Sequence, residues 1–388
     1  MDLTLELTDE QRALRGMLRE FGDAEIAPYA GEWDRSGTFP AATIRQLGQL
    51  GVMGLPFPEQ YGGVGAGAGT LSMAIALEEL ARVDSSVAVT VAASVSLGGA
   101  PILNFGTEEQ KQRWLAPLAR GESIGAFAST EPGMGSDVQG LSTTARQSDG
   151  GWLINGTKAY ITNAGTELSS FVTTTAITGE RRPGRAEIST FIVPVDAPGF
   201  VPQRPYAKMG WHASDTRELA YQDCRVAPDA MLGERGAGAR VFLATLDGGR
   251  IGVAAMGVGL ARGCLEQSVA WANQRCAFGQ PISHYQAVSF ELAELKARIE
   301  AARGLVFRAA ALKDAGKPVT EEAATAKLIA SELAVHAANV AMQVHGGYGY
   351  MEESAIPRFY RDAKILTIGE GTSEILKLVI ARQMGLSV

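Results

Sequence analysis

Cysteine is scarce in this sequence. The 388 residues include only Cys224, Cys264 and Cys276, an odd number without a Cys-x-x-Cys pair. This pattern excludes a disulfide framework and argues against a structural zinc site, so we expect a reducing compartment, the cytoplasm. The four histidines do not cluster at metal-ligand spacing, and we expect no metal site.

Positive charge is also limited. Lys and Arg number 35 against 42 Asp and Glu, which gives a formal net charge of -7. A broad basic surface is therefore missing, and no nucleic-acid partner is expected. The uncharged run 85–107 contains Pro101 and is broken by Gly98-Gly99. We interpret it as a buried helix of a large core, so no membrane span is expected.

The chain is too long for one ordinary core, and its texture changes twice along the sequence. Helical periodicity dominates residues 1–121, β-like segments dominate 122–233, and long helical patterns fill 234–388. The sequence therefore predicts an α+β multidomain protein. We expect an N-terminal all-α domain, a middle antiparallel β-barrel or sheet domain, and a C-terminal four-helix bundle.

Individual elements follow from periodicity and turn signals. The expected helices begin at Thr8-Asp9-Glu10 and cover 41–50, 70–83, 108–120, 239–275, 285–315, 320–344 and 372–384. The expected strands cover 124–129, 152–162, 171–176, 189–195 and 218–223. The Asn155-Gly156 pair predicts a two-residue hairpin between two of the apolar runs.

Five blocks of sequence carry residues suited to chemistry. They are FASTEPGMGSD (127–137), INGTKAYITNA (154–164), QRCAFGQPI (274–282), QVHGGYGY (343–350) and RDAKILTIGEGTSEI (361–375). In the last block Glu370 lies between two glycines just before an expected helix. That position suits an uncrowded general base, but it equally suits an acidic residue stabilised by the helix dipole. Each block alone has such an ordinary structural explanation.

Taken together, the order and spacing of these blocks resemble the acyl-CoA dehydrogenase family of flavoproteins, over essentially the full length. The resemblance implies an FAD-dependent enzyme whose flavin lies between the β domain and the C-terminal helices. It implies that Phe127, Thr130 and Ser136 line the flavin and the substrate thioester. Tyr160 would stack near the ring, where relatives often have Trp, and Thr162 would hydrogen-bond toward N5.

The resemblance also implies a homotetramer, because cofactor binding in the family crosses between subunits. Arg275 would hold the pyrophosphate of a neighbouring subunit's FAD, while Thr372 and Glu374 would contact FAD from the helix after the base. The residues implied to bind the ADP half are Phe278, Gln286, Gln343, Gly346 and Gly347. Ala277 stands where some relatives carry Thr.

For the substrate, the segment 246–250 matches a helix that flanks the acyl thioester in relatives, so Asp247 and Arg250 are expected substrate contacts, together with Ser136 and Gly371. One branch of the family carries its base immediately before the matching Arg, where this chain has Gly249. The chain therefore resembles the short- and medium-chain branch, with Glu370 as base. Gly369 replaces a Tyr of many relatives, which prevents the acyl chain length from being carried over.

The implied reaction is the α,β-dehydrogenation of an acyl-CoA to a trans-2-enoyl thioester. Glu370 would take the α-proton, its backbone N–H and a ribityl hydroxyl would stabilise the carbonyl oxygen, and hydride would pass to flavin N5. The implied electron acceptor is an electron-transfer flavoprotein. Three alternatives stay open: a dehydrogenase of acyl- or aminoacyl-carrier-protein thioesters in a biosynthetic pathway, a flavin oxidase or monooxygenase, and a flavin-free assembly module.

Overall fold

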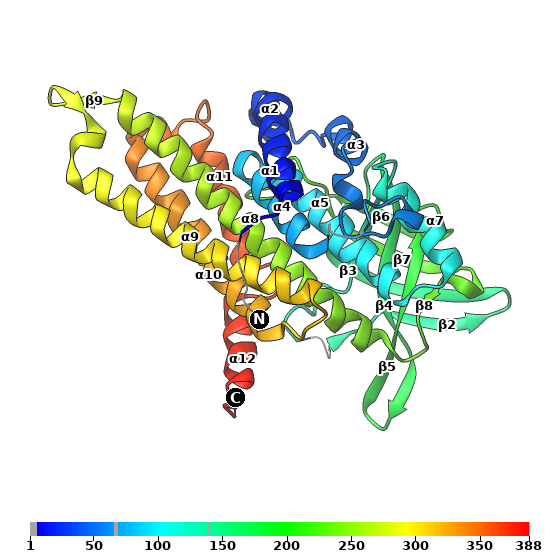
Figure 1. Cartoon of the computed structure of the whole chain (residues 1–388). Coiled ribbons are helices and arrows are strands. Elements are labelled where there is room, and N and C mark those ends of the chain that lie inside the picture. Colours follow the sequence, from blue (N-terminus) through cyan, green and yellow to red (C-terminus); the bar gives the residue numbers. More distant parts are fainter. Residues whose placement is uncertain (1–5, 66–68, 138–139, 388) are drawn as a thin grey trace.

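The computed structural model describes residues 6–65, 69–137 and 140–387. Helices from both ends of the chain pack together into one helical region, and the β domain lies at its side (Figure 1). The predicted order of helices, sheet and helices is confirmed.

The N-terminal part is helical. Its longer helices are α1 (Asp9–Phe21), α2 (Ala27–Ser36), α3 (Ala41–Gln49), α4 (Gly69–Val83), α5 (Ser85–Ala92), α6 (Ala100–Phe105) and α7 (Glu108–Ala119), with π-helical segments η1 (Gly22–Ile26) and η4 (Ala93–Gly99). Helix α1 begins where predicted because the Thr8 hydroxyl accepts from the Gln11 N–H and the Gln11 side chain accepts from the Thr8 N–H. The same capping box, Thr107 with Gln110, starts α7.

The run 85–107 forms three successive helical segments inside the core, as predicted. Residues Ser85–Phe105 and helix α8 (Gly238–Gln274) are both long and apolar enough to cross a membrane by length and composition. In the most apolar 18-residue stretch of each, 78% of Ser85–Phe105 and 67% of α8 is buried inside this chain. Their hydrophobicity is thus accounted for by the core between the two helical parts.

The β domain is one twisted sheet with strand order β6-β7-β3-β2-β4-β5-β8 and with β1 beside β4. The strands are β1 (Ile124–Ala128), β2 (Thr144–Ser148), β3 (Gly151–Thr162), β4 (Ser169–Arg182), β5 (Arg185–Pro194), β6 (Phe200–Pro205), β7 (Thr216–Val226) and β8 (Met231–Leu232). Most pairs are antiparallel, as predicted, but β1 and β2 pair with β4 in parallel. Strands β2 and β6 were missed because both are short and largely exposed.

The predicted hairpin at Asn155-Gly156 is wrong. Strand β3 runs straight through both residues, and the hairpin to β2 turns instead at Asp149-Gly150. Gly156 has φ 148° and lies at a register shift between β3 and β7, while the Asn155 side chain bonds to the backbone and side chain of Asp223. The turn-forming pair therefore marks a β-bulge.

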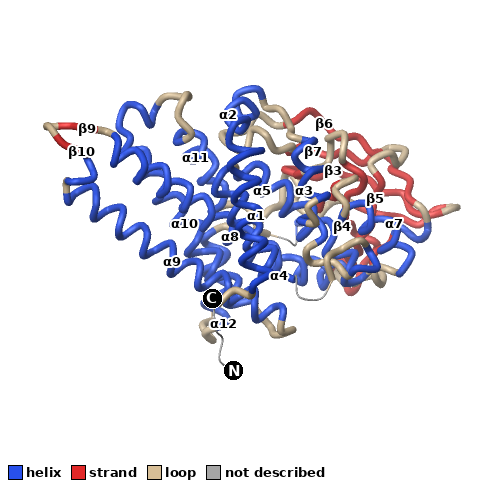
Figure 2. Tube along the Cα trace, turned by 45° about the horizontal axis from the view of Figure 1, so that its top comes forward, coloured by secondary structure: helices blue, strands red, loops and turns tan. Residues whose placement is uncertain are grey.

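The C-terminal part contains α8 (Gly238–Gln274), α9 (Gln286–Asp314), α10 (Thr320–His345), α11 (Ile356–Ala363) and α12 (Ser373–Gln383). Helices α8, α9 and α10 run side by side (Figures 1 and 2). A small hairpin, β9 (Cys276–Ala277) with β10 (Gln280–Pro281), projects from the end of these helices that lies away from the sheet. The short segments η8 (Gly346–Tyr350) and η9 (Lys364–Thr367) lie between the later helices.

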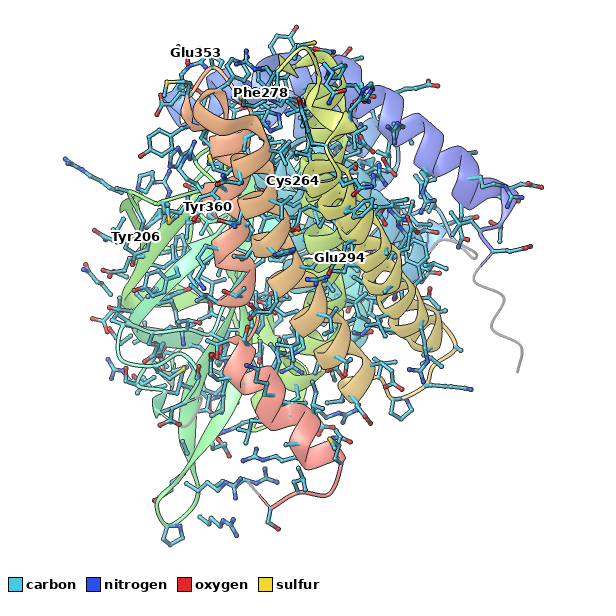
Figure 3. All side chains as sticks on the ribbon, turned by 90° about the vertical axis from the view of Figure 1, so that its left-hand side faces the viewer. Tyr206, Cys264, Phe278, Glu294, Glu353 and Tyr360 are labelled. Atoms are coloured by element: carbon cyan, nitrogen blue, oxygen red, sulfur yellow. The ribbon has the colours of Figure 1, made fainter. Side chains whose placement is uncertain are left out.

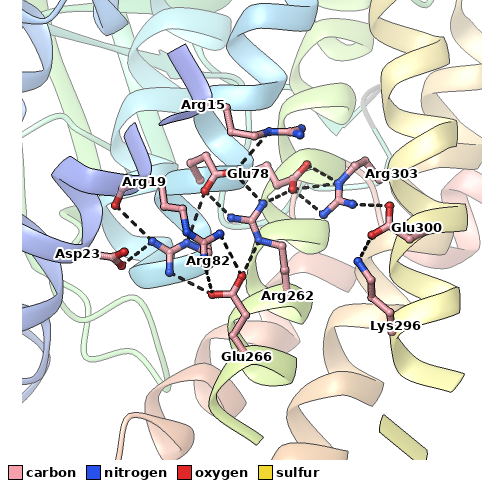
Figure 4. A network of polar contacts seen from close by, with 11 residues as sticks. Arg15, Arg19, Asp23, Glu78, Arg82, Arg262, Glu266, Lys296, Glu300 and Arg303 are labelled. Atoms are coloured by element: carbon pink, nitrogen blue, oxygen red, sulfur yellow. Dashed lines mark hydrogen bonds and ion pairs between the residues drawn. The ribbon is translucent and has the colours of Figure 1, made fainter. Parts of the chain in front are cut away.

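Helix α4 packs closely on α8. A Cβ atom on Gly259 would lie 2.2 Å from the Glu78 carbonyl oxygen, so only glycine permits this approach. Beside this contact lies a network of charged residues from α1, α4, α8 and α9 (Figure 4). Its centre is Arg262, which donates to the fully buried carboxylates of Glu78 and Glu79. Because these buried carboxylates pair with guanidiniums from the facing helices, the network fixes how the four helices align.

Candidate active site

Glu370 lies in the turn between η9 and α12, just before the helix, as predicted. The Thr372 side chain accepts from the Ile375 N–H and caps α12. Glu370 has φ 55° and Gly371 has φ 95°. A non-glycine residue with positive φ is uncommon and is kept only where the surrounding structure holds it. The backbone therefore presents the Glu370 side chain in a specific, strained conformation.

The carboxyl group of Glu370 points at α8 beside Gly249. A Cβ atom built on Gly249 would lie 2.5 Å from Glu370 Oε2 and 2.8 Å from Leu97 Cδ2. The Glu370 residue is half-buried as a whole, but Oε2 is buried and has no hydrogen-bond partner among the residues described. The absence of a side chain at position 249 thus makes room for a carboxylate with one oxygen free to receive a proton.

Burial and the neighbouring charges shift the pKa of the Glu370 carboxyl group in opposite directions. Burial raises the pKa of its carboxyl group, while the positive charges of Arg250 and Lys327 lower it. Arg250 is buried on α8 and its guanidinium lies 3.4 Å from Asp247, which also accepts a hydrogen bond from Thr320. The structure therefore brings the predicted residues Glu370 and Arg250 together, with Asp247 behind Arg250. It adds Lys327, which the sequence did not reveal.

Phe127 lies on the same side of α8. Its ring stacks on that of Phe242, with centroids 6.2 Å apart. Phe242 precedes Gly249 by about two helical turns, or roughly 10 Å, so Phe127 and Glu370 contact one face of α8. The end of β1 and the turn before α12 therefore face the same side of α8, although they are far apart in sequence.

The other residues predicted to face the flavin lie in the loop after β1 and on β3. The Thr130 carbonyl oxygen accepts from the Ala159 N–H at 2.9 Å, which holds the loop after β1 against β3. Next to it Tyr160 has φ 60°, is 67% exposed and lies 5.3 Å from the ring of Tyr206. Thr162 is half-buried at the end of β3, and Ser136 is exposed on the loop. An aromatic face and a hydroxyl are therefore available at this edge.

A buried ion pair fixes that loop. Lys158 on β3 donates to Glu131 at 2.9 Å and to the Ser129 carbonyl oxygen at 3.2 Å. Glu131 also accepts from the backbone N–H groups of Ser142 and Thr143. No local signal distinguishes Lys158 and Glu131 from other charged residues, because their contact forms only when β3 packs under the loop.

A second group of predicted cofactor residues lies elsewhere. Arg275 and Gln286 flank the β9–β10 hairpin, and Phe278 lies in its turn, 97% exposed with φ 50°. Figure 3 shows Phe278 at the outer end of the helices and Tyr206 on the β domain. Stacking of Trp271 on Tyr348, with centroids 4.7 Å apart, brings η8 to the same end. The exposed residues Gln343, Gly346 and Gly347 lie there too.

The two groups are well separated within one chain. Lys327, whose ammonium group touches the turn after Glu370, and Gln343 are both on α10. At a rise of about 1.5 Å per residue they lie roughly 24 Å apart. Thr372 and Glu374 belong to the first group, near Glu370, with Glu374 exposed. A single chain therefore presents Glu370 and the hairpin at different places.

Trp211, His212 and Arg217, for which the sequence suggested no role, have structural partners. The Trp211 N–H donates to the Asp362 carboxylate at 2.6 Å, and Arg217 pairs with Asp215 at 2.7 Å. His212 contacts the Asp34 carbonyl oxygen at 3.0 Å. These contacts tie the loop before β7 to α2 and α11.

Comparison with known proteins covers nearly the whole chain. The models of the acyl-CoA dehydrogenase N-terminal, middle and C-terminal domains match residues 8–122, 126–224 and 236–385. The probable acyl-CoA dehydrogenase YngJ of Bacillus subtilis is 49% identical over 382 residues, which cover 98% of this chain and 100% of the relative.

Solved structures agree. Butyryl-CoA dehydrogenase from Megasphaera elsdenii is 42% identical with a TM-score of 0.94, and the match covers 99% of this chain and 100% of that one. A chain from the structure of the electron transferring flavoprotein system of Acidaminococcus fermentans is 41% identical with a TM-score of 0.94, covering 99% of both. The chain therefore belongs to the acyl-CoA dehydrogenase family, oxidoreductases that use FAD to dehydrogenate acyl-CoA thioesters.

Proposed function

We propose that Glu370 is the base that removes the α-proton of the acyl-CoA. The observation that carries this proposal is the buried Oε2 of Glu370, which has no partner among the described residues and faces the space over Gly249. Burial raises the pKa of this carboxyl group toward the working pH, which strengthens it as a base, while Arg250 and Lys327 keep it ionised. An acidic residue serving only the helix dipole would need neither burial nor an open oxygen.

The predicted flavin-facing residues around β1, β3 and the turn before α12, the first group, fit a bound flavin. Tyr160 offers an exposed ring held in a rare backbone conformation, and Thr162 offers a hydroxyl on the same strand. We propose that Phe127, Thr130 and Ser136 complete this side, with Thr372 and Glu374 opposite. Bound FAD supplies the acceptor for the β-hydride, while the chain supplies the base and the N–H of Glu370 as a donor to the thioester oxygen.

The residues of the second group support a site shared between subunits. Arg275, Phe278 and Gln343 lie far from Glu370 in one chain, yet they are exposed, and Phe278 has a positive φ and is 97% exposed. We propose that, with Gln286, Gly346 and Gly347, they bind the ADP half of a neighbouring subunit's FAD. The active enzyme is then a homo-oligomer, which we propose is a tetramer.

For the substrate, we propose a short-chain acyl-CoA, supported by the similarity to butyryl-CoA dehydrogenase. The open space at Gly369 bears on the length of the acyl chain that the site accepts. A Cβ atom built at this position would have only the Ile365 carbonyl oxygen within 4 Å, at 3.7 Å. We propose that Asp247, Arg250, Ser136 and Gly371 contact or frame the thioester. A panel of acyl-CoA and carrier-protein thioesters, compared by kcat/KM, distinguishes this substrate from the carrier-bound alternative.

We further propose an electron-transfer flavoprotein as acceptor and the cytoplasm as location. The exposed Tyr160, whose ring lies against that of the half-buried Tyr206, leaves an aromatic surface beside the proposed flavin edge at which an acceptor can approach. We expect the substrate-reduced flavin to be reoxidised slowly by air and rapidly by an electron-transfer flavoprotein. Rapid peroxide release would favour an oxidase instead.

Glu370→Gln tests the central role. The variant should be purified yellow and should bind substrate, but single-turnover bleaching of the flavin by the acyl-CoA should fall by at least about 10³-fold, because no carboxylate remains to take the proton. Bleaching at a rate near that of the wild type would remove Glu370 from its role.

A further inference from the structure

Lys327 is one of the largest fully buried side chains of the protein, and it lies on α10 directly behind the turn that carries Glu370. Its ammonium group donates to the Gly371 carbonyl oxygen at 2.6 Å. This bond crosses from one helix of the bundle to the turn before another. It is therefore a tertiary tie to the peptide unit next to the proposed base.

That peptide unit needs a tie. Glu370 and Gly371 both have positive φ, 55° and 95°, and a non-glycine residue in this region persists only when surrounding groups over-determine it. The N-cap of α12, Thr372, fixes the helix but not the orientation of the Gly371 carbonyl. The bond from Lys327 does fix it.

Helix α10 holds the turn at a second point. The Ser373 hydroxyl donates to the Glu332 carboxylate, one and a half turns further along α10. The two contacts lie on either side of Thr372 and hold residues 371–373 against α10 at two points. The donor in the second contact, the Ser373 hydroxyl, is neutral, whereas the donor in the first, the Lys327 ammonium group, is charged. Burying an apolar side chain at position 327 would cost less free energy than burying this charge.

We propose that Lys327 is a positioning residue for catalysis: it holds the Gly371 carbonyl so that the Glu370 carboxylate faces the substrate space, and its charge keeps that carboxylate ionised. The inference rests on Glu370 being the base. Lys327 acts through its hydrogen bond to the turn that carries Glu370 and through the electric field of its ammonium group. No contact between Lys327 and the substrate is required.

The surrounding charges support this assignment. The charged groups acting on Glu370 are Arg250 from α8 and Lys327 from α10, and both lower its pKa. Burial lowers the pKa of Lys327 to about 8, with Glu370, Glu332 and Glu374 opposing this change and Arg250 adding to it. Lys327 is thus mostly charged at neutral pH, when the base must be deprotonated.

The test uses the FAD-loaded enzyme and the pH dependence of flavin bleaching under saturating acyl-CoA. In Lys327→Met the limiting rate should fall about 10²-fold, the loss expected for displacing a reacting group by about 1 Å. The rise of rate with pH should also move to higher pH, because Glu370 loses a neighbouring positive charge. The Kd for acyl-CoA should change less than threefold.

Further variants separate positioning from folding. Lys327→Gln can still donate to Gly371 without a charge, so it should recover part of the rate but keep the displaced pH profile. Lys327→Arg should return the profile toward that of the wild type. The control is Ser331→Ala, a buried position one turn further along α10 whose hydroxyl donates to the Leu328 carbonyl oxygen of the same helix. The rate and the pH profile of this variant should be unchanged.

A wild-type pH profile in folded, FAD-loaded Lys327→Gln would overturn the proposal, and so would a Lys327→Met variant that loses thermal stability but bleaches at the wild-type rate. Failure of this inference is distinguishable from failure of the proposed function. In the first case Glu370→Gln is still inactive, whereas in the second Glu370→Gln itself bleaches normally.

Discussion

Gly249→Ala is expected to impair catalysis while leaving the fold intact. The new methyl group would lie 2.5 Å from Glu370 Oε2 and 2.8 Å from Leu97 Cδ2, both ends of flexible side chains. To regain ordinary van der Waals separation, the carboxylate must retreat by about 1 Å. A displacement of that size at a reacting group costs about 10²-fold in rate, or about 2.7 kcal/mol of transition-state stabilisation.

The stability of this variant should change little. Alanine is favoured over glycine in a helix interior by about 1 kcal/mol, which offsets the small shifts of the two side chains. The control is Gly248→Ala on the same helix, where the new Cβ meets only the Lys313 side chain at 3.5 Å or more.

The assay is single-turnover flavin bleaching by a short-chain acyl-CoA, with FAD content and Tm measured on each preparation. Gly249→Ala should keep its FAD and its Tm within a few degrees while losing rate, and Gly248→Ala should keep all three. If Gly249→Ala bleached at the rate of the wild type, the Glu370 carboxylate would not lie over α8 as described.

Two further substitutions test structural contacts outside the site, the packing of α4 on α8 and the buried pair of Glu131 and Lys158. Gly259→Ala should lower the free energy of unfolding by about 1–3 kcal/mol, because its Cβ would lie 2.2 Å from the Glu78 carbonyl oxygen of the facing helix. The measurement is chemical denaturation, and an unchanged midpoint would contradict the close contact between α4 and α8. Burial alone would raise the pKa of Glu131, but hydrogen bonds from Ser142 and Thr143 and the Lys158 ammonium lower it to about 2. Its contribution to stability is therefore complete above its ordinary pKa of 4.5 and is lost as the pH falls toward 2, so Tm should decline less steeply over this range in Glu131→Gln than in the wild type.

The sequence predicted the domain order and the place of Glu370 because both depend on local signals. Periodicity marks helices and strands, and a glycine-flanked acid before a helix is visible in a short window. Asn155-Gly156 misled because its turn preference is also local, while strand pairing with β7 decides the outcome.

Lys327 illustrates what local signals leave out. In the sequence it is a lysine within an alanine-rich helical pattern, which ordinarily indicates a solvent-exposed position. Its contact with Gly371 joins residues 44 positions apart and exists only after α10 and α12 pack. Lys158 and Glu131 escaped notice for the same reason, since their pairing crosses from a loop to a strand.

Helix α8 extends without interruption from Gly238, against Ile188 of the sheet, to Gln274 beside the projecting hairpin. At about 1.5 Å per residue it is roughly 55 Å long, and this length sets the distance between Glu370 and the outer end of the molecule. A single residue inserted between Arg250 and Trp271 would turn everything beyond it by about 100°. The length of this helix is thus far less free to vary than its composition.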